Sequence, residues 1–214
     1  MFFSVLLRTV LFKMCNAMPM TVSKTRDMLV DVARQLFARM GVDNTTMNDI
    51  AQASQKGRRT LYTYFKSKNE IYLAVVESEL DQLYKMLLDV AGKDLPADEK
   101  LMTFVYARLD AIKALVFRNG TLRANFFRDI WRVEKVRKSF DLREIEIIKG
   151  ILDAGVEEGV FSMPDTDITA VVLHHALKGL EVPYIRGIMG DNISQRIKRR
   201  DNVMNLIFNG IKIK

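Results

Sequence analysis

Proline is scarce along this chain, and its spacing limits what the chain can fold into. The 214 residues contain four prolines, at positions 19, 96, 164 and 183, and the stretches between them are rich in Leu, Ala, Met, Glu and Lys. Proline interrupts helices, whereas those other residue types favour them. Apolar residues supply 49% of the chain, which excludes a disordered or fibrous protein. With no convincing strand pattern, the sequence predicts an all-α fold of about nine helices.

The first predicted helix has a clear beginning and end. Apolar residues recur at helical spacing over residues 24–40, and Gly41 follows as a stop. A second, two-turn helix is expected at 47–53, because Thr46 and Asp49 form a variant of the capping box.

Two more helices are predicted after the short connection at 54–56. A helix at 57–65 places Leu61 and Phe65 on its inner side. The segment "SKNE" at 67–70 is a capping box, which starts a long helix that ends near Val90. This long helix joins the two halves of the chain.

Further helical patterns follow an exposed connector at 92–99. Gly159 follows the third of them, and Pro183 ends or kinks the fourth. The patterns cover residues 101–116, 122–131, 142–152, 163–180 and 193–207.

Charge is distributed unevenly between the two halves. The net charge is +7; residues 21–68 hold nine Lys or Arg against four Asp or Glu, whereas residues 69–214 hold 22 of each sign. A basic segment beside a neutral one indicates that only the first part meets a polyanion. A basic surface kept for solubility is the alternative.

Few residues are suited to catalysis or metal binding. Cys15 is the only cysteine, so no disulfide can form within the chain and a reducing compartment is expected. His174 and His175 are the only histidines, and they are poor evidence for a metal site without Cys or paired carboxylates nearby. A nucleophile–base pair and a phosphate loop are also absent from the sequence. We therefore expect no enzyme activity, no cofactor and no metal.

Residues 1–20 form an apolar leader of uncertain status. Arg8 and Lys13 interrupt it well before the roughly 20 apolar residues that a membrane span needs. A non-native or misassigned leader is one interpretation, and a short docking helix is another. No membrane partner is expected, although a helical interaction or membrane-surface protein that uses this leader and the basic segment stays open as an alternative function.

The short helices at 47–53 and 57–65 predict a helix-turn-helix, because a tight connection joins them and the helix at 24–40 supports them. In this motif the second helix enters the major groove of DNA by its N-terminal residues. Because Leu61 and Phe65 face inward, the outer side or the helix start is left to Arg58, Arg59, Thr60, Thr63 and Tyr64.

The segment "TTMNDIAQASQKGRRTLYTYFKSKNEIY" (45–72) resembles the DNA-binding part of the tetracycline-repressor (TetR) family of bacterial regulators. Its matching features are the Thr-rich entry, Ile50-Ala51, Thr60-Leu61-Tyr62, Tyr64-Phe65 and Ser67-Lys68. "ARQLFARMGVDNTT" (33–46) is similar to the family's first helix and its exit. The resemblance covers residues 24–76. The turn departs from the family pattern, since Gln55 stands at the usual glycine, Lys56 at the usual buried valine and Gly57 at the usual capping serine.

The resemblance implies a set of DNA contacts. Side chains expected in the groove are Arg58, Arg59, Thr63 and Tyr64. Side chains expected at backbone phosphates are Thr46, Lys56, Thr60, Tyr62 and Lys68. Plain packing is the alternative for Tyr62, and a purely capping role is the alternative for Thr46.

The resemblance also implies a division of labour. Residues 21–68 are expected to form the DNA-binding domain, and residues 69–214 a helical domain that binds a small-molecule effector and forms a homodimer through the last two long helices. The protein would then be a cytoplasmic repressor, released from double-stranded operator DNA by its effector. Candidate effector-pocket residues are Phe104, Arg108, Phe127, Trp131 and His175. Ordinary core packing is the alternative for the aromatic residues, and a solvated position for Arg108.

Overall fold

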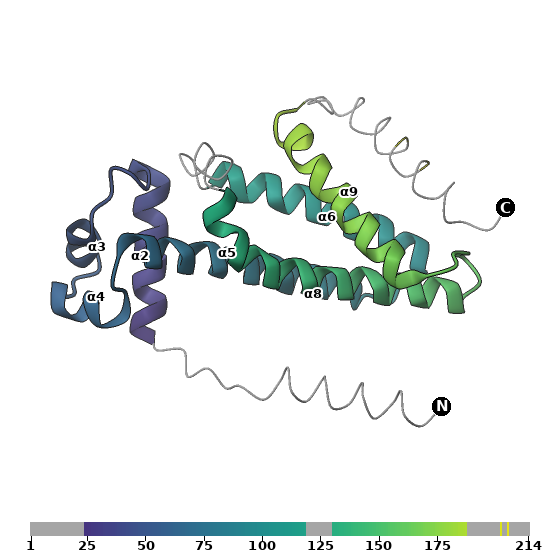
Figure 1. Ribbon diagram of the computed structural model, residues 1–214, viewed down its shortest axis with the longest axis horizontal. Helices are drawn as coiled ribbons and strands as arrows, with labels where there is room; N and C mark the ends of the chain where they lie inside the picture. Colours follow the sequence, from purple (N-terminus) through teal and green to yellow (C-terminus); the bar gives the residue numbers. More distant parts are fainter. Residues whose placement is uncertain (1–23, 119–129, 188–201, 203–204, 206–214) are drawn as a thin grey trace, which may run out of the picture.

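The computed structural model describes residues 24–118, 130–187, 202 and 205. Within these ranges the chain forms seven helices, which make up a small N-terminal head and a longer body (Figure 1). The head contains α2 (Lys24–Met40), α3 (Met47–Ala53) and α4 (Arg58–Tyr64). The body contains α6 (Ala97–Arg118), α8 (Ile130–Glu157) and α9 (Thr166–Ile185), and α5 (Lys68–Ala91) runs from the head into the body. The predicted all-α class is confirmed.

Helix α2 supports the head through its apolar face. Leu29, Ala33 and Phe37 are completely buried on this face. The helix ends where Gly41 adopts a φ of 88°, and the N–H of Gly41 donates to the carbonyl of Phe37 at 3.0 Å. Glycine adopts a positive φ without steric cost because it lacks Cβ. The predicted helix at 24–40 and its glycine stop are both confirmed.

Helix α5 starts at a cap that differs in one detail from the expected capping box. The Ser67 hydroxyl accepts the N–H of Glu70 at 3.2 Å, as predicted. The Glu70 carboxylate, however, accepts the N–H of Lys66 at 2.6 Å, one residue before the cap. The helix then runs to Ala91, close to the predicted end.

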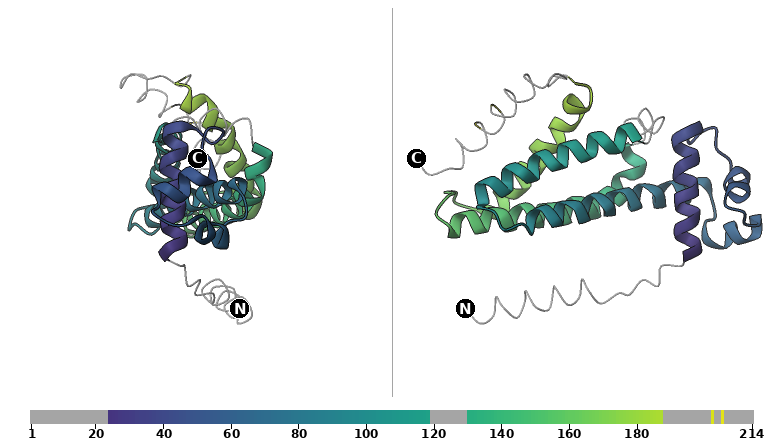
Figure 2. Two further views of the ribbon diagram at one scale, coloured as in Figure 1. Left: turned by 90° about the vertical axis from the view of Figure 1, so that its left-hand side faces the viewer. Right: turned by 180° about the vertical axis from the view of Figure 1, so that it is seen from behind.

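The body is a bundle in which α5 and α8 lie side by side and α6 and α9 cover them (Figure 2). Helix α8 is longer than the sequence pattern indicated. The predicted stripes at 122–131 and 142–152 leave residues 132–141 without a helix, whereas all residues from Ile130 to Glu157 belong to one helix. Arg137 is buried within this gap and interrupts the apolar repeat there.

The head and the body have separate hydrophobic cores. The head core includes Phe37, Ile50 and Leu61, and the body core lies between α5, α6, α8 and α9. Val76 of α5 packs against both cores. Helix α5 is therefore the element through which the two parts are packed together.

Some predictions fall outside the described ranges. These are the leader at 1–20, most of the stripe at 122–131 and most of the helix at 193–207, of which Asn202 and Asn205 are described and are helical. Among the described helices, none combines the length and the apolar character that crossing a membrane requires.

Candidate nucleic-acid interface

Helices α3 and α4 lie at the outer end of the head, on the side away from the body (Figure 1). The start of α3 is fixed by a capping box. The Thr46 hydroxyl accepts the N–H of Asp49 at 3.2 Å, and the Asp49 carboxylate accepts the N–H of Thr46 at 2.8 Å. Hydrogen bonds from the side chain and then the backbone of Thr46 lower the pKa of Asp49. The predicted cap at Thr46 is confirmed.

The turn after α3 keeps a regular helix-ending geometry without the family's glycine. Gln55 adopts a φ of 54°, in the left-handed region. Its N–H donates to the carbonyl of Gln52 at 3.0 Å, and the N–H of Lys56 donates to the carbonyl of Ala51 at 3.1 Å. This pair of bonds is the Schellman motif, in which the left-handed residue is usually glycine. The turn therefore forms despite the substitution, with Gln55 in a strained conformation.

Helix α4 is held by two apolar side chains and presents cations on its other side. Leu61 and Phe65 are buried in the head core, as predicted. Lys56, Arg58 and Arg59 are all exposed. Gly57 caps the helix with no side-chain hydrogen bond. The three cations thus lie at the start of the second helix of a helix-turn-helix, where the motif meets DNA.

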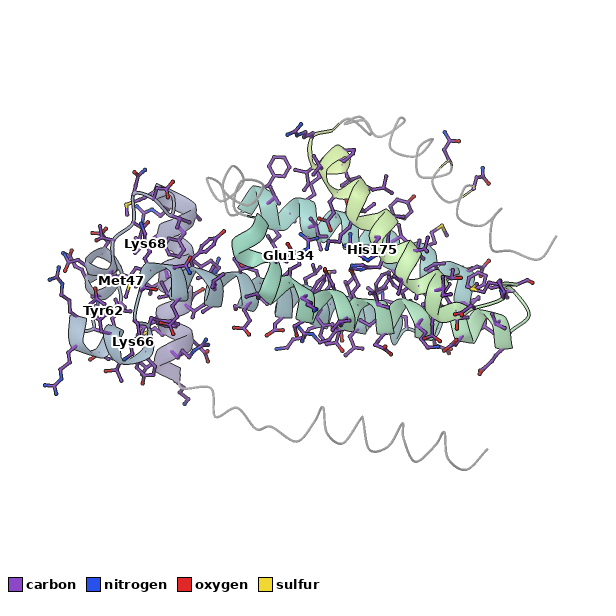
Figure 3. The ribbon with its side chains drawn as sticks, in the orientation of Figure 1. Met47, Tyr62, Lys66, Lys68, Glu134 and His175 are labelled. Carbon is purple, nitrogen blue, oxygen red and sulfur yellow. The ribbon has the colours of Figure 1, made fainter. Side chains whose placement is uncertain are left out.

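The other predicted contact residues on α4 differ in exposure. Tyr62 is 44% exposed, on the outer end of the head (Figure 3), and Thr63 is exposed with its hydroxyl donating to the carbonyl of Arg59 at 2.9 Å. Thr60 is half-buried. Tyr64 is half-buried and packs against the head core.

Lys68 lies at the junction of the head with α5 (Figure 3). Its Nζ donates to the carbonyl of Val42 at 2.7 Å and to the carbonyl of Asp43 at 3.1 Å. An ammonium group has three donors, so one is left for a further acceptor such as a phosphate. The side chain ties the loop between α2 and α3 to the start of α5.

One contact joins the two helices of the motif and was not expected. The Nε of Arg58 donates to the Oδ1 of Asn48 at 2.8 Å, and both side chains are exposed. Asn48 belongs to the first turn of α3, and Arg58 is the first residue of α4. Asn48 was not among the predicted contact residues, since nothing in its local pattern marks it.

Three of the predicted effector-pocket residues have described side chains, and these three differ in exposure. Phe104 is completely buried in the body core, and Arg108, one turn further along α6, is also completely buried. His175 is exposed on α9. Phe127 and the side chain of Trp131 lie outside the described residues. Arg108 is therefore not solvated, and of the two histidines His174 is the buried one.

Arg108 is the centre of a buried ionic cluster between α6, α8 and α9. Its Nε lies 2.5 Å from Glu144 Oε1, and its Nη2 lies 2.8 Å from Glu181 Oε1. Arg137 lies 2.8 Å from the same Glu181 oxygen. His174 Nδ1 lies 2.8 Å from Glu144 Oε2, in the geometry of an ion pair rather than of a well-aligned hydrogen bond.

Two further residues extend the cluster toward the surface. Asp141 Oδ2 accepts from the Nζ of Lys178 at 2.7 Å, and Asp141 Oδ1 lies 3.6 Å from His174 Nε2. Among the described residues no group of three His, Cys, Asp or Glu side chains has the arrangement of a metal site. The cluster is instead an alternation of cations and carboxylates.

The pKa values in the cluster follow from this alternation. Burial alone would lower the pKa of Arg108, but Glu144 and Glu181 outweigh it and raise this pKa. Burial would also lower the pKa of His174, but the carboxylates of Asp141 and Glu144 raise it above its ordinary value. In the opposite sense, burial would raise the pKa of Asp141, but His174, Lys178 and Arg137 lower it to about 2. These three shifts favour the charged forms of Arg108, His174 and Asp141.

The sequence contained a signal for this cluster that apolar periodicity alone does not detect. Polar residues follow the spacing i, i+4, i+7 on both long helices. On α8 they are Arg137, Asp141 and Glu144, and on α9 they are His174, Lys178 and Glu181. Alternating charges at helical spacing indicate a helix face that forms ion pairs, and here the two stripes pair with each other across α8 and α9.

Comparison with known proteins adds to this geometry. Residues 29–75 match the model of the bacterial regulatory proteins of the tetR family. The chain is 30% identical over 161 residues to the HTH-type transcriptional repressor KstR2 of Mycolicibacterium smegmatis, covering 72% of this chain and 75% of that protein. It is 20% identical over 189 residues to the HTH-type transcriptional regulator QacR of Staphylococcus aureus, covering 87% and 97%.

A solved structure shows that the likeness extends over head and body. The transcriptional regulator from Cytophaga hutchinsonii superposes with a TM-score of 0.69, covering 87% of this chain and 98% of that one, at 24% sequence identity. At this identity the superposition establishes a common fold.

Proposed function

The chain belongs to the TetR family of bacterial regulatory proteins, and from this membership we infer that it is a DNA-binding transcriptional regulator that acts as a repressor. The observation that carries the inference is the placement of Lys56, Arg58 and Arg59. These cations lie exposed at the start of α4, at the end of the head that faces away from the body. Since its partner is DNA, we place the protein in the cytoplasm.

Helix α4 is the part of the head that we propose enters the major groove. Arg58, Arg59, Thr63 and Tyr64 would lie in the groove. The half-buried position of Tyr64 limits it to the edge of that contact. The backbone phosphates would be contacted by the exposed or partly exposed polar groups around α4, namely Thr46, Lys56, Thr60, Tyr62 and Lys68. Phosphate contacts position the head, and base contacts specify the sequence.

A homodimer is the assembly that this function needs. Dimeric helix-turn-helix proteins read two half-sites about one turn of B-DNA apart, or a multiple of it. Helix α9 carries exposed apolar side chains on one side, with Ile168 63% and Val172 61% exposed. His175 lies on the same side of the helix, three residues beyond Val172. We propose that this side of α9 packs against a second copy of the chain.

The effector is proposed to act in the body, beside Phe104 and Arg108. Buried ion pairs rarely add stability compared with apolar residues of the same size, so a cluster of this extent is a candidate for a functional role. The cluster joins α6, α8 and α9, and a ligand that competes for one of its partners would change how these helices pack.

Helix α5 connects such a change to the head. Midway along α5, Asp81 lies 2.6 Å from Arg143 of α8, and the same guanidinium lies 4.4 Å from the ring centroid of Tyr84. Two residues earlier on α5, Glu79 lies 3.7 Å from Arg34 of α2. A movement of α8 would therefore shift α5 and alter the spacing of the two heads. The effector can shift this equilibrium only by its difference in affinity for the two states.

Genomic footprinting of the bound sites, followed by binding titrations on those sites, tests this proposal. We expect one or a few operators, with transcription of the neighbouring genes rising when the regulator is deleted. An effector found from those genes should weaken operator binding. A regulator whose deletion lowers transcription would contradict the assignment as a repressor, and tight ligands that all leave DNA affinity unchanged would contradict the role of α5.

A further inference from the structure

Arg58 and Arg59 are neighbours in sequence, but their guanidinium groups have different surroundings in the structure. The Nε of Arg58 donates to Asn48 Oδ1 at 2.8 Å, across the turn between α3 and α4. No comparable partner holds the guanidinium of Arg59 in the part of the chain that the structure describes. One arginine is thus restrained by a second helix, and the other is attached only through its own flexible side chain.

The atom that Asn48 holds determines what Arg58 can still do. A guanidinium group has five N–H donors in a fixed planar arrangement, one on Nε and two on each terminal nitrogen. With Nε occupied, the two terminal nitrogens stay available as a pair. A pair of this geometry matches O6 and N7 of guanine in the major groove, which is the commonest specific contact to that base.

Asn48 is well suited to this task because it is neutral and firmly placed. Its amide oxygen accepts the bond without cancelling the positive charge of Arg58 or repelling a phosphate. The first turn of α3 is fixed by the capping box of Thr46 and Asp49, and α4 is fixed by the buried Leu61. The geometry between the two helices therefore sets the direction of the Arg58 side chain before DNA arrives.

We propose that Asn48 is a positioning residue that orients Arg58 to read a guanine, while Arg59 contacts the DNA backbone. The inference rests on the proposed DNA-binding function and refines it, because it moves Arg59 from the base contacts of the groove to the phosphates at the edge of the groove. Restraining the side chain in advance lowers the entropy that it would lose on binding. Specificity at one base pair of each half-site should accordingly depend on a residue that does not touch that base.

Selection of bound sequences from a random duplex library, read by sequencing, tests the proposal with the full-length chain. The wild type should select a motif with one guanine per half-site that Arg58→Ala abolishes, a loss of roughly 5- to 100-fold in preference for that base. Asn48→Ala should weaken the same preference several-fold and leave the other positions unchanged. Arg59→Ala should lower affinity for all sequences about equally.

Two further measurements separate positioning from a structural effect. Asn48→Asp keeps the acceptor oxygen and should retain the guanine preference, with weaker overall binding because of its added negative charge. Circular dichroism should show Asn48→Ala fully folded, since alanine favours an exposed helical position. A wild-type guanine preference in Asn48→Ala, or loss of that preference in Arg59→Ala instead of Arg58→Ala, would overturn the proposal. A wild type that selects no motif would instead refute the proposed function itself.

Discussion

The head and the body of this regulator place their charges in opposite ways. In the head, Arg58 and Arg59 are exposed, and the helices pack around an apolar core. In the body, Arg108, Glu144 and Glu181 are buried among three helices and pair with one another. An exposed charge is already hydrated, whereas a buried charge persists only with partners. The exposed charges of the head are therefore available to bind a polyanion. The buried charges of the body instead hold α6, α8 and α9 against one another.

Of the substitutions considered, one that breaks the buried cluster should lower the free energy of unfolding most. Arg108→Met leaves Glu144 and Glu181 buried without their shared cation, and breaking a buried pair typically costs about 3–5 kcal/mol. Urea unfolding of the full-length protein measures the change in free energy.

An exposed pair in the same body provides the control. Lys149 lies 3.1 Å from Asp167, whose side chain is 72% exposed. Lys149→Ala should change the free energy of unfolding by less than about 1 kcal/mol. If both variants lose the same stability, burial is not what distinguishes the cluster.

Replacing Lys68, the half-buried lysine of the head, should lower the stability by an intermediate amount. Lys68→Met removes two hydrogen bonds from a charged donor to the carbonyls of Val42 and Asp43. Such bonds contribute about 1.5–3 kcal/mol each when buried, and partial hydration of this site reduces the expected total loss to roughly 1–2 kcal/mol. Thermal unfolding measures the stability of Lys68→Met and of a control variant, Lys66→Met, in which the replaced lysine is exposed. Equal stability of the two variants would mean that Lys68 does not tie the loop to α5.

Relieving the strained turn should give a smaller effect of the opposite sign. Gln55→Gly removes a side chain from a left-handed position and should stabilise the head by about 0.5–1 kcal/mol, because the gain exceeds the added entropy of the unfolded chain. The matched control is Gln52→Gly within α3, which should cost up to about 1 kcal/mol. Chemical denaturation gives both values, and a loss of stability in Gln55→Gly would show that its φ carries no strain.

Titration of the cluster should give the smallest effect, since only one group changes its charge. The pKa of His174 is raised in the folded protein, so its contribution to stability is complete below its unfolded pKa and is lost as pH rises through the folded pKa. The midpoint of urea unfolding should therefore fall as pH rises from about 6.5. His174→Gln should remove this dependence and the exposed His175→Gln should keep it. The reverse pattern would place the titration outside the cluster.

The fold was largely predictable because apolar periodicity and helix caps are local signals. The helix at 24–40, the Gly41 stop and the Thr46 cap were all found from residues within one or two turns of each other. The helical stretch at 132–141 was missed for a physical reason. Arg137 is buried there, and a charge at a core position cannot be recognised from one helix alone.

The candidate site was predictable to a lesser degree. The exposure of Arg58 and Arg59 followed from the inward position of Leu61 on the same short helix. The contact between Asn48 and Arg58 joins residues ten positions apart across a turn, so it depends on how two helices meet. The partners of Arg108 are 36 and 73 residues away, and only the folded chain brings them together.

The salt dependence of DNA binding tests most directly whether the head's charges are the DNA-binding ones. Each phosphate contact contributes roughly −0.9 to the slope of log K against log salt. Replacing Lys56, Arg58 and Arg59 by Gln should make the slope less steep by about 2 or more. Replacing the exposed body residues Lys85, Lys93 and Lys138 by Gln should leave it unchanged. Equal slopes for the two triple variants, or no binding by the wild type even at low salt, would contradict the assignment.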